Sequence, residues 1–389
     1  MSSGKSKRRL DESLTSASGL TFSFTLGLLG VTIPLLAVSY GYRIADIGVL
    51  VAISGAAQLV SRLWIGALLR KVSDKWLVIA AGVLLTASCL LITVSSLFAV
   101  FVISQLLQGA ARAYFWTASQ THVVRVAERS VGGLARFNLA AGIGALAGPL
   151  AAGILIQFQG QWTLITGAIG SAIATVFAIL LVRLPPFAPP AHSSNTRMWR
   201  RPEIRAGICM GTIAGSWRGI LGSYVPVILA VAGISPVIVG TLATVANLAA
   251  VAGGSGIGLI RPLRPRVVLL VSGLATGLSV AALGLMAGDP ILAGVCLAIS
   301  GLGAGALQTI STAAVADAVH AEERGDSIAT SGTYRAAALV LTPLIAAGVV
   351  AVAPISIAFV VVGLLSSVLS FLGGADPEPK LGSNAAHRN

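Results

Sequence analysis

Residues 99–122 read AVFVISQLLQGAARAYFWTASQTH, an almost uninterrupted apolar stretch that carries one arginine, Arg112. A helix needs about 20 mostly apolar residues to cross a bilayer. Strands of a membrane barrel would alternate polar and apolar residues, so helices are the predicted form. Twelve stretches qualify: residues 17–39, 46–68, 77–98, 99–122, 131–156, 162–183, 204–231, 236–260, 266–287, 290–316, 327–352 and 354–373. The sequence therefore predicts an all-α polytopic membrane protein with twelve transmembrane helices.

The composition supports this class. The chain is 56% hydrophobic and only 10% charged, whereas a soluble domain carries about 25% charged residues. The net charge of +13 would favour nucleic acid as the partner of a soluble protein. Here the basic residues alternate from loop to loop, so the lipid bilayer is the predicted partner and no nucleic acid is expected.

The distribution of basic residues predicts the orientation. Twenty of the 26 Lys and Arg lie in the termini and in the loops that follow even-numbered spans, and only Arg43 lies in the opposite loops. Basic loops stay on the cytoplasmic side, so both termini are predicted to be cytoplasmic. The short loops and low lysine content are typical of a bacterial inner (cytoplasmic) membrane protein.

The longest internal loop, residues 184–203, is polar and rich in proline, and it separates six spans from six. Residues at a constant offset of 192 match between the halves: Pro34, Gly48 and Gly66 with Pro226, Gly240 and Gly258. The alternative is chance, because glycine is common in this chain. We predict two pseudo-symmetric six-helix bundles, residues 1–183 and 204–373, joined by the cytoplasmic linker 184–203 and followed by a cytoplasmic tail, 374–389.

Three short motifs lie beside or within these spans. They read Gly66-Ala-Leu-Leu-Arg70-Lys71-Val-Ser-Asp74-Lys75, Gln105-Leu-Leu-Gln108-Gly109 and Gly144-Ala-Leu-Ala-Gly148-Pro149-Leu-Ala-Ala-Gly153. Together with the six-plus-six pattern, they make the chain resemble the major facilitator superfamily over nearly its whole length. The resemblance implies a secondary transporter.

Two of the motifs depart from the family pattern. Arg70 stands where the family has an aspartate that helps to latch the two halves, while Gly66 and Lys71 fit the pattern. Gln105 replaces an arginine that is tied to proton movement in proton-coupled members, and Arg112 lies two turns further along the same face. Arg70 at this position argues against the standard latch.

The third motif resembles the glycine–proline element of exporters in the family. Gly144 and Gly148 permit close helix packing, and Pro149 bends the helix. The resemblance implies efflux, and the alternative interpretation is a packing kink alone.

Five arginines lie inside predicted spans, and no Asp or Glu lies in a span interior. An arginine at the bilayer centre costs roughly 2.5–3.5 kcal/mol, so these side chains are expected to face protein, water or a ligand. Arg112 and Arg218 lie nearest the membrane centre and are predicted to bind substrate. Arg62 and Arg335 are predicted to act at a gate or to bond neighbouring helices, and Arg136 is predicted to reach the headgroups.

Other polar and aromatic side chains lie at similar depth. Those predicted to line a substrate site are Gln58, Gln108, Trp116, Trp217, Asn247 and Gln308. The alternative for each is helix–helix contact within the core. The residues predicted to take part in gating are Arg62, Arg335, Gly66, Arg70, Lys71, Gly144, Gly148 and Pro149.

These features predict a secondary transporter that moves a small organic solute, with efflux as the expected direction and a negatively charged cargo. One alternative is uptake or exchange of a small anion, and another is a non-transporting receptor or scaffold on the same fold. No enzyme motif, phosphate-binding loop, metal site or cofactor site is apparent. Proton coupling would have to go through Asp46 or through ionisation of the substrate. The transporter is expected to be a monomer.

Overall fold

The computed structural model describes residues 2–127, 130–186, 202–257, 264–319 and 324–373, and every regular element in these ranges is a helix. The first six helices are α1 (Ser2–Ser39), α2 (Ile44–Lys71), α3 (Asp74–Val94), α4 (Phe98–Val126), α5 (Ser130–Ile156) and α6 (Gly160–Leu180). The others are α7 (Pro202–Leu221), α8 (Tyr224–Val231), α9 (Pro236–Gly256), α10 (Pro265–Met286), α11 (Pro290–Asp317), α12 (Arg324–Val350) and α13 (Ile355–Phe371).

Ten helices of the described chain are long and apolar enough to cross a membrane, and α7 with α8 makes an eleventh if the bent pair is one span. The twelfth predicted span, 354–373, corresponds to α13, which has 17 residues and lies at the short limit for a bilayer crossing. The helical, multi-span character of the prediction is confirmed, whereas the number twelve stays a prediction.

Residues 204–231 were predicted as one helix, but the chain bends there by 43° between α7 and α8. The break falls at Gly222 and Ser223, three residues before Pro226. Proline lacks the N–H that would continue the α7 ladder, and in the first turn of α8 it needs no such bond. The prediction of a continuous helix was therefore wrong at this point.

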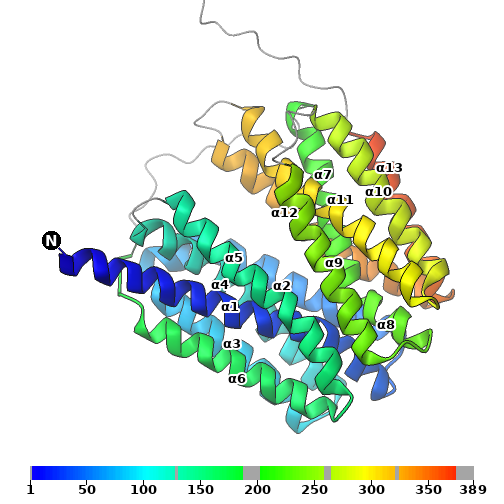
Figure 1. The fold of residues 1–389 in the computed structure, drawn as a ribbon, viewed down its shortest axis with the longest axis horizontal. Helices are drawn as coiled ribbons and strands as arrows, with labels where there is room; N and C mark the ends of the chain where they lie inside the picture. Colours follow the sequence, from blue (N-terminus) through cyan, green and yellow to red (C-terminus); the bar gives the residue numbers. More distant parts are fainter. Residues whose placement is uncertain (1, 128–129, 187–201, 258–263, 320–323, 374–389) are drawn as a thin grey trace, which may run out of the picture.

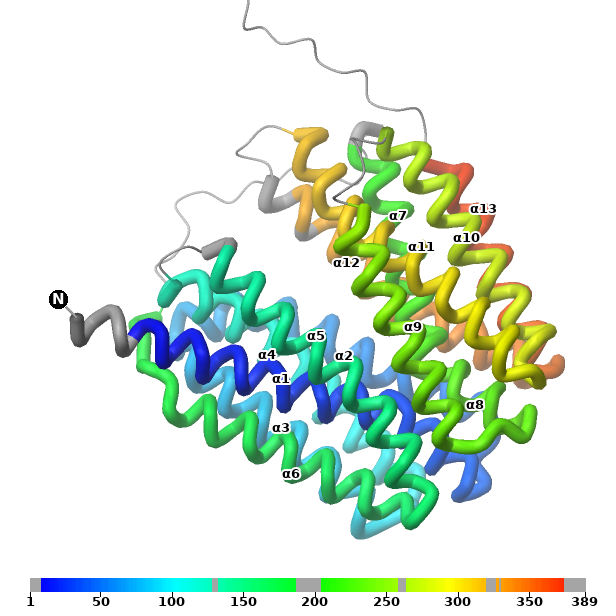
Figure 2. The backbone as a smooth tube through the Cα atoms, in the orientation of Figure 1, coloured from blue at the N-terminus to red at the C-terminus, as the bar shows by residue number. Residues whose placement is uncertain are grey.

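The helices form two groups, α1–α6 and α7–α13 (Figures 1 and 2). Within the first group α1 packs on α5 and α6, and α4 packs on α2 and α3. Within the second group α11 packs on α7, α9 and α10. The main contacts between the groups are α2 with α12 and α5 with α9. The two groups diverge towards the end of the molecule where α1 begins (Figure 1).

Glycines bring the two groups into backbone contact. A Cβ added to Gly48 of α2 would lie 2.6 Å from the carbonyl oxygen of Pro343 in α12. A Cβ added to Gly240 of α9 would overlap the carbonyl oxygen of Pro149 and lie 3.0 Å from the Cα of Gly153, both in α5. We call this region, defined by Gly48, Pro149, Gly153, Gly240 and Pro343, the contact end, and the opposite end of the molecule the open end.

Candidate functional site

Helix α4 presents a row of polar side chains within the protein. Gln105 and Gln108 are each only 2% exposed. The Nη2 group of Arg112, one turn on, donates a hydrogen bond of 2.9 Å to Oε1 of Gln108. Since arginine has no acceptor, this bond fixes the Gln108 amide with its Nε2 group directed elsewhere. That Nε2 group, Nε2 of Gln105 and Nε of Arg112 are buried without a hydrogen-bond partner.

Arg218 of α7 is held in a similar way from the second group of helices. Its Nη1 group donates to Oδ1 of Asn247 in α9 at 2.6 Å. Asn247 is itself oriented because its Nδ2 group donates to the carbonyl oxygen of Ala243. Trp217 is 4% exposed and donates from Nε1 to Oγ of Ser300, so its indole packs inside the second group.

Four arginines are near enough to one another for pairwise electrostatic repulsion. Arg112 repels Arg218, Arg218 repels Arg335, and Arg335 repels Arg62. We call these four residues the arginine cluster. Arg62 and Arg112 belong to α2 and α4 of the first group, whereas Arg218 and Arg335 belong to α7 and α12 of the second. Within the described ranges, no member forms an ion pair with a carboxylate.

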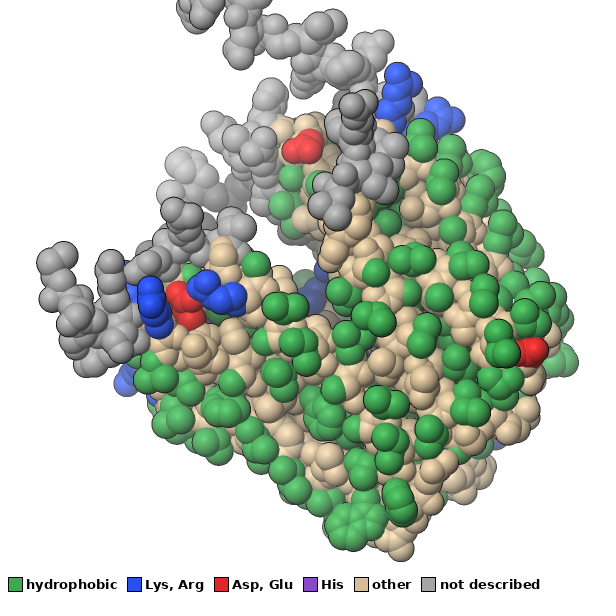
Figure 3. All heavy atoms as spheres, viewed as in Figure 1, with side chains coloured by type: hydrophobic (Ala, Val, Ile, Leu, Met, Phe, Trp, Pro, Cys, Tyr) green, Lys and Arg blue, Asp and Glu red, His purple; other side chains and the backbone are tan. Residues whose placement is uncertain are grey.

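The cluster members retain access to solvent. Arg218 is exposed, and Arg62, Arg112 and Arg335 are partly exposed, although all four belong to apolar helices. Figure 3 shows a hollow between the two groups of helices, and Lys or Arg side chains are visible inside it. In this hollow, which lies at the junction between the two groups, cationic side chains avoid contact with lipid.

Comparison with known proteins agrees with this architecture. A family model described as the Major Facilitator Superfamily matches residues 15–343. The chain belongs to the major facilitator superfamily. This membership makes it a multi-pass membrane protein and a secondary transporter rather than an enzyme. No curated protein matches the transporter.

Solved structures share the fold of the transporter at low sequence identity. A mutant form of the nucleoside transporter NupG is 17% identical, with a TM-score of 0.80, and the match covers 94% of this chain and 98% of that one. A POT family transporter in complex with a thioalcohol-conjugated peptide is 13% identical, with a TM-score of 0.76 and coverage of 94% and 95%. A POT family transporter in complex with 5-aminolevulinic acid gives 13%, a TM-score of 0.74 and coverage of 94% and 95%.

The remaining predicted substrate residues lie in different settings. Trp116 belongs to an aromatic cluster and meets the ring of Phe137 edge to face at 5.9 Å. Gln58 is partly buried on α2, and Gln308 of α11 is exposed. Only Gln108 and Asn247 of the predicted polar set are hydrogen-bonded to arginines of the cluster.

One predicted unpaired arginine proves to have an acid partner. Arg136 of α5 forms an ion pair with Glu12 of α1, and its side chain is 63% exposed. The sequence analysis, which searched span interiors for acids, therefore missed this partner. Glu12 was overlooked because it precedes the predicted first span, whereas α1 begins at Ser2.

The predicted gating residues fall into two sets. Gly144 and Gly148 lie against the α1 backbone, where an added Cβ would come 2.9 Å from the amide nitrogen of Phe24 and 2.6 Å from that of Leu28, respectively. Pro149 meets Gly240 across the contact end. A Cβ on Gly66, by contrast, would meet open space, and Arg70 and Lys71 are exposed.

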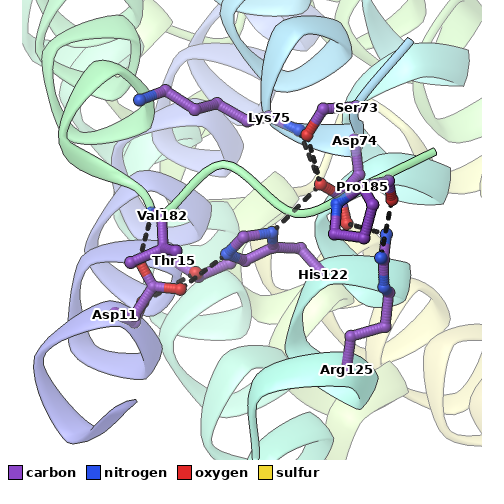
Figure 4. A network of polar contacts seen from close by, with 9 residues as sticks. All are labelled: Asp11, Thr15, Ser73, Asp74, Lys75, His122, Arg125, Val182 and Pro185. Atoms are coloured by element: carbon purple, nitrogen blue, oxygen red, sulfur yellow. Dashed lines mark hydrogen bonds and ion pairs between the residues drawn. The ribbon is translucent and has the colours of Figure 1, made fainter. Parts of the chain in front are cut away.

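The sequence analysis missed a buried ionic network near the start of α1 (Figure 4). Nε2 of His122 lies 2.7 Å from Oδ2 of Asp11, and its Nδ1 lies 3.3 Å from Oδ1 of Asp74. The other oxygen of Asp74 lies 3.3 Å from Nη1 of Arg125. The side chains of Asp11, Asp74 and His122 are at most 3% exposed. We call these four residues the ionic network.

The ionic network also holds the chain that leaves α6. Oδ1 of Asp11 accepts a hydrogen bond from the Val182 amide at 2.8 Å. Arg125 donates from Nη2 to the carbonyl oxygen of Pro185 at 2.7 Å. The four members come from α1, α3 and α4, so they fasten the start of the predicted linker to the first group of helices (Figure 4). The only sequence signal was that charged residues occur at several span ends, which also fits simple contact with headgroups.

Proposed function

We propose that the transporter moves a small organic anion by alternating access, with efflux as the physiological direction. The observation that carries the proposal is the arginine cluster, which draws two cations from each group of helices and contains no carboxylate partner among the described residues. Guanidinium groups keep their charge in proteins. An anion in the hollow is therefore the simplest source of compensating charge.

The proposal includes the finer architecture. It has twelve spans, both termini in the cytoplasm of a bacterial cell, and two pseudo-symmetric bundles, residues 1–183 and 204–373. Support comes from the contact end, where Gly48 meets Pro343 and Gly240 meets Pro149. Gly48 and Gly240 are the residues paired by the offset of 192, so matching positions of the two halves make matching contacts.

Alternating access gives the two ends their roles. With the termini in the cytoplasm, the contact end closes the extracellular side and the hollow opens inward. Helices α5 and α9 meet through Gly153 and Gly240, and Thr244 donates to the carbonyl oxygen of Leu146 across the same junction. We assign gating at this end to Pro149 and to the glycines around it, and substrate binding to the arginine cluster with Gln108 and Asn247.

The direction rests on the exporter-like element around Gly148 and Pro149. Uptake or exchange of an anion is the second candidate, because the same cationic site would serve it. No described carboxylate lies in the arginine cluster to carry a proton. We therefore assign the driving force to the anion itself rather than to a coupling proton.

Flux measurements in proteoliposomes test the proposal. The purified transporter, reconstituted as the expected monomer, should support counterflow of labelled organic anions, and the double variant Arg112→Ala/Arg218→Ala should abolish it. Arg136→Ala is the matched control, because Arg136 is an arginine of α5 outside the cluster. In intact cells that produce the transporter, accumulation of the labelled anion rather than its loss would reject efflux. Anion binding without flux would support a receptor, and anion flux surviving in the double variant would reject the site.

A further inference from the structure

Outside the ionic network, six buried polar groups of α2 and α4 lack a partner. Four are N–H donors: Nε of Arg62, Nε of Arg112 and the Nε2 groups of Gln105 and Gln108. The other two are the hydroxyls of Ser54 and Ser119, which can donate as well. Buried polar groups in proteins are nearly always satisfied by protein, ordered water or a ligand, so these four N–H donors are the groups that a ligand would satisfy on binding. A ligand that satisfies them must present several acceptor oxygens, as phosphate and carboxylate groups do.

A purely structural role for the arginines leaves this pattern unexplained. Arg112 uses Nη2 on Gln108, and Arg218 uses Nη1 on Asn247, yet each guanidinium has five N–H donors. Neither bond compensates charge, because both acceptors are neutral amides. The helices are thus linked by these bonds, and no carboxylate in the described part of the chain pairs with any of the four arginines.

The division of charge between the two groups of helices sets the charge of the ligand. Each group contributes two arginines, and repulsion between Arg112 and Arg218 acts across the junction of the groups. A ligand with one negative charge would leave three of the four cations uncompensated. A ligand with two charges can place one against each group and turn repulsion across the junction into attraction.

We propose, building on the transport function above, that the cargo is a small organic dianion, a phosphomonoester or a dicarboxylate, and that transport is an exchange of anion for anion. For the site to face the other side of the membrane, the open end must close. Closure leaves the cluster in a smaller space with less water. Like charges repel more strongly as water is excluded. The empty transporter therefore resists the switch, whereas the dianion-bound transporter passes through it, and each outward trip must be followed by a loaded return.

Exchange is measured with vesicles that contain the full-length transporter and a labelled dianion. The membrane potential is clamped with potassium and valinomycin. Efflux is followed into buffer without permeant anions and into buffer with an unlabelled phosphomonoester or dicarboxylate outside. We expect efflux into the anion-free buffer to be slower by at least about ten-fold. Equal rates in the two buffers would overturn the exchange mechanism.

A panel of solutes tests the charge of the cargo and keeps the two proposals separable. A phosphomonoester, a dicarboxylate, a monocarboxylate and a neutral nucleoside are offered as external counter-substrates. Stimulation by the phosphomonoester alone or the dicarboxylate alone identifies which acceptor group is used. Equal stimulation by the monocarboxylate would reject the dianion but keep the proposed function. Transport of the nucleoside alone would reject both.

Arg335→Gln gives an independent test within the cluster. Removing one cation weakens the repulsion, so efflux into anion-free buffer should rise and the preference for dianions over monoanions should fall. Arg335→Lys, which keeps the charge, should retain exchange, and Arg136→Gln controls for the loss of an arginine elsewhere. If Arg335→Gln is as dependent on external dianion as the unchanged transporter, the charge argument fails.

Discussion

The transporter buries charge in two contrasting regions. In the ionic network, two carboxylates lie against the imidazole of His122 and the guanidinium of Arg125, so every contact joins an acidic group to a basic one. In the arginine cluster, every charged neighbour identified is another cation. A matched network is complete without a ligand and serves the fold. A cluster of like charges destabilises the protein unless another molecule compensates it, and such uncompensated charge is typical of functional sites.

The largest effect should follow from breaking the matched region. In Asp74→Ala, His122 and Arg125 lose their shared carboxylate inside the protein. Removing one partner of a buried ion pair costs about 3–5 kcal/mol. We expect a large fall in the unfolding temperature of the detergent-solubilised transporter, followed by intrinsic fluorescence during heating.

Asp46→Ala is the control for this change. Asp46 pairs with Arg43, whose side chain is 84% exposed, so its loss should hardly shift the unfolding temperature. A small effect of Asp74→Ala, comparable to that of Asp46→Ala, would contradict the structural role of the network.

Removing a charge from the arginine cluster should stabilise the empty transporter, which is the opposite of the effect expected in the ionic network. Arg112→Gln removes a charge that repels Arg218, so the empty transporter should unfold at a higher temperature. Affinity for the anion should fall roughly 10- to 100-fold, because hydrogen bonds to charged groups contribute about 1.5–3 kcal/mol. Both effects are measured by thermal unfolding over a titration of the anion. A loss of stability together with unchanged affinity would mean that Arg112 serves the fold alone.

The sequence indicated the arginine cluster but not the ionic network. The unmatched cations were visible, because arginines inside apolar stretches stand out against a chain without intramembrane acids. The matched network was not, because Asp11 and His122 lie 111 positions apart and only the fold brings them to 2.7 Å. The acid partner of Arg136 was missed for the same reason, since nothing local in the sequence pairs it with Glu12.

The helix breaks show a second limit of the sequence. Pro34 and Pro226 were matched by the internal repeat, yet α1 runs through Pro34 while the chain breaks before Pro226. A proline removes one hydrogen bond and kinks a helix, and the packing around it decides whether the helix continues. The glycine half of the repeat was more informative, because Gly48 and Gly240 both sit where a Cβ would strike a backbone carbonyl.

An intermediate effect is expected at the contact end, which offers a test of the closed gate. Gly240→Val would push the side chain into the Pro149 carbonyl and the Gly153 backbone. Overpacking of this kind costs about 1–3 kcal/mol. The closed contact end should become less populated, and spin-label distances between α5 and α9 should increase. Gly66→Ala is the control, because its added methyl group meets open space. An unchanged distance distribution in Gly240→Val would remove this end from the gating proposal.

The smallest effect should come from the exposed pair of Arg136 and Glu12. Arg136 resembles the cluster arginines in sequence, because it lies in an apolar stretch. It resembles the ionic network in structure, because it has an acid partner. Arg136→Ala breaks the ion pair with Glu12, and the Arg136 side chain is 63% exposed. Exposed pairs contribute at most about 1 kcal/mol, because water solvates both charges when they part. Unfolding temperature and anion exchange should therefore stay close to those of the unchanged transporter, measured in the same two assays. If exchange fell as far as in the cluster variants, position along the apolar helices, rather than the absence of a matching acid, would decide which arginines serve transport.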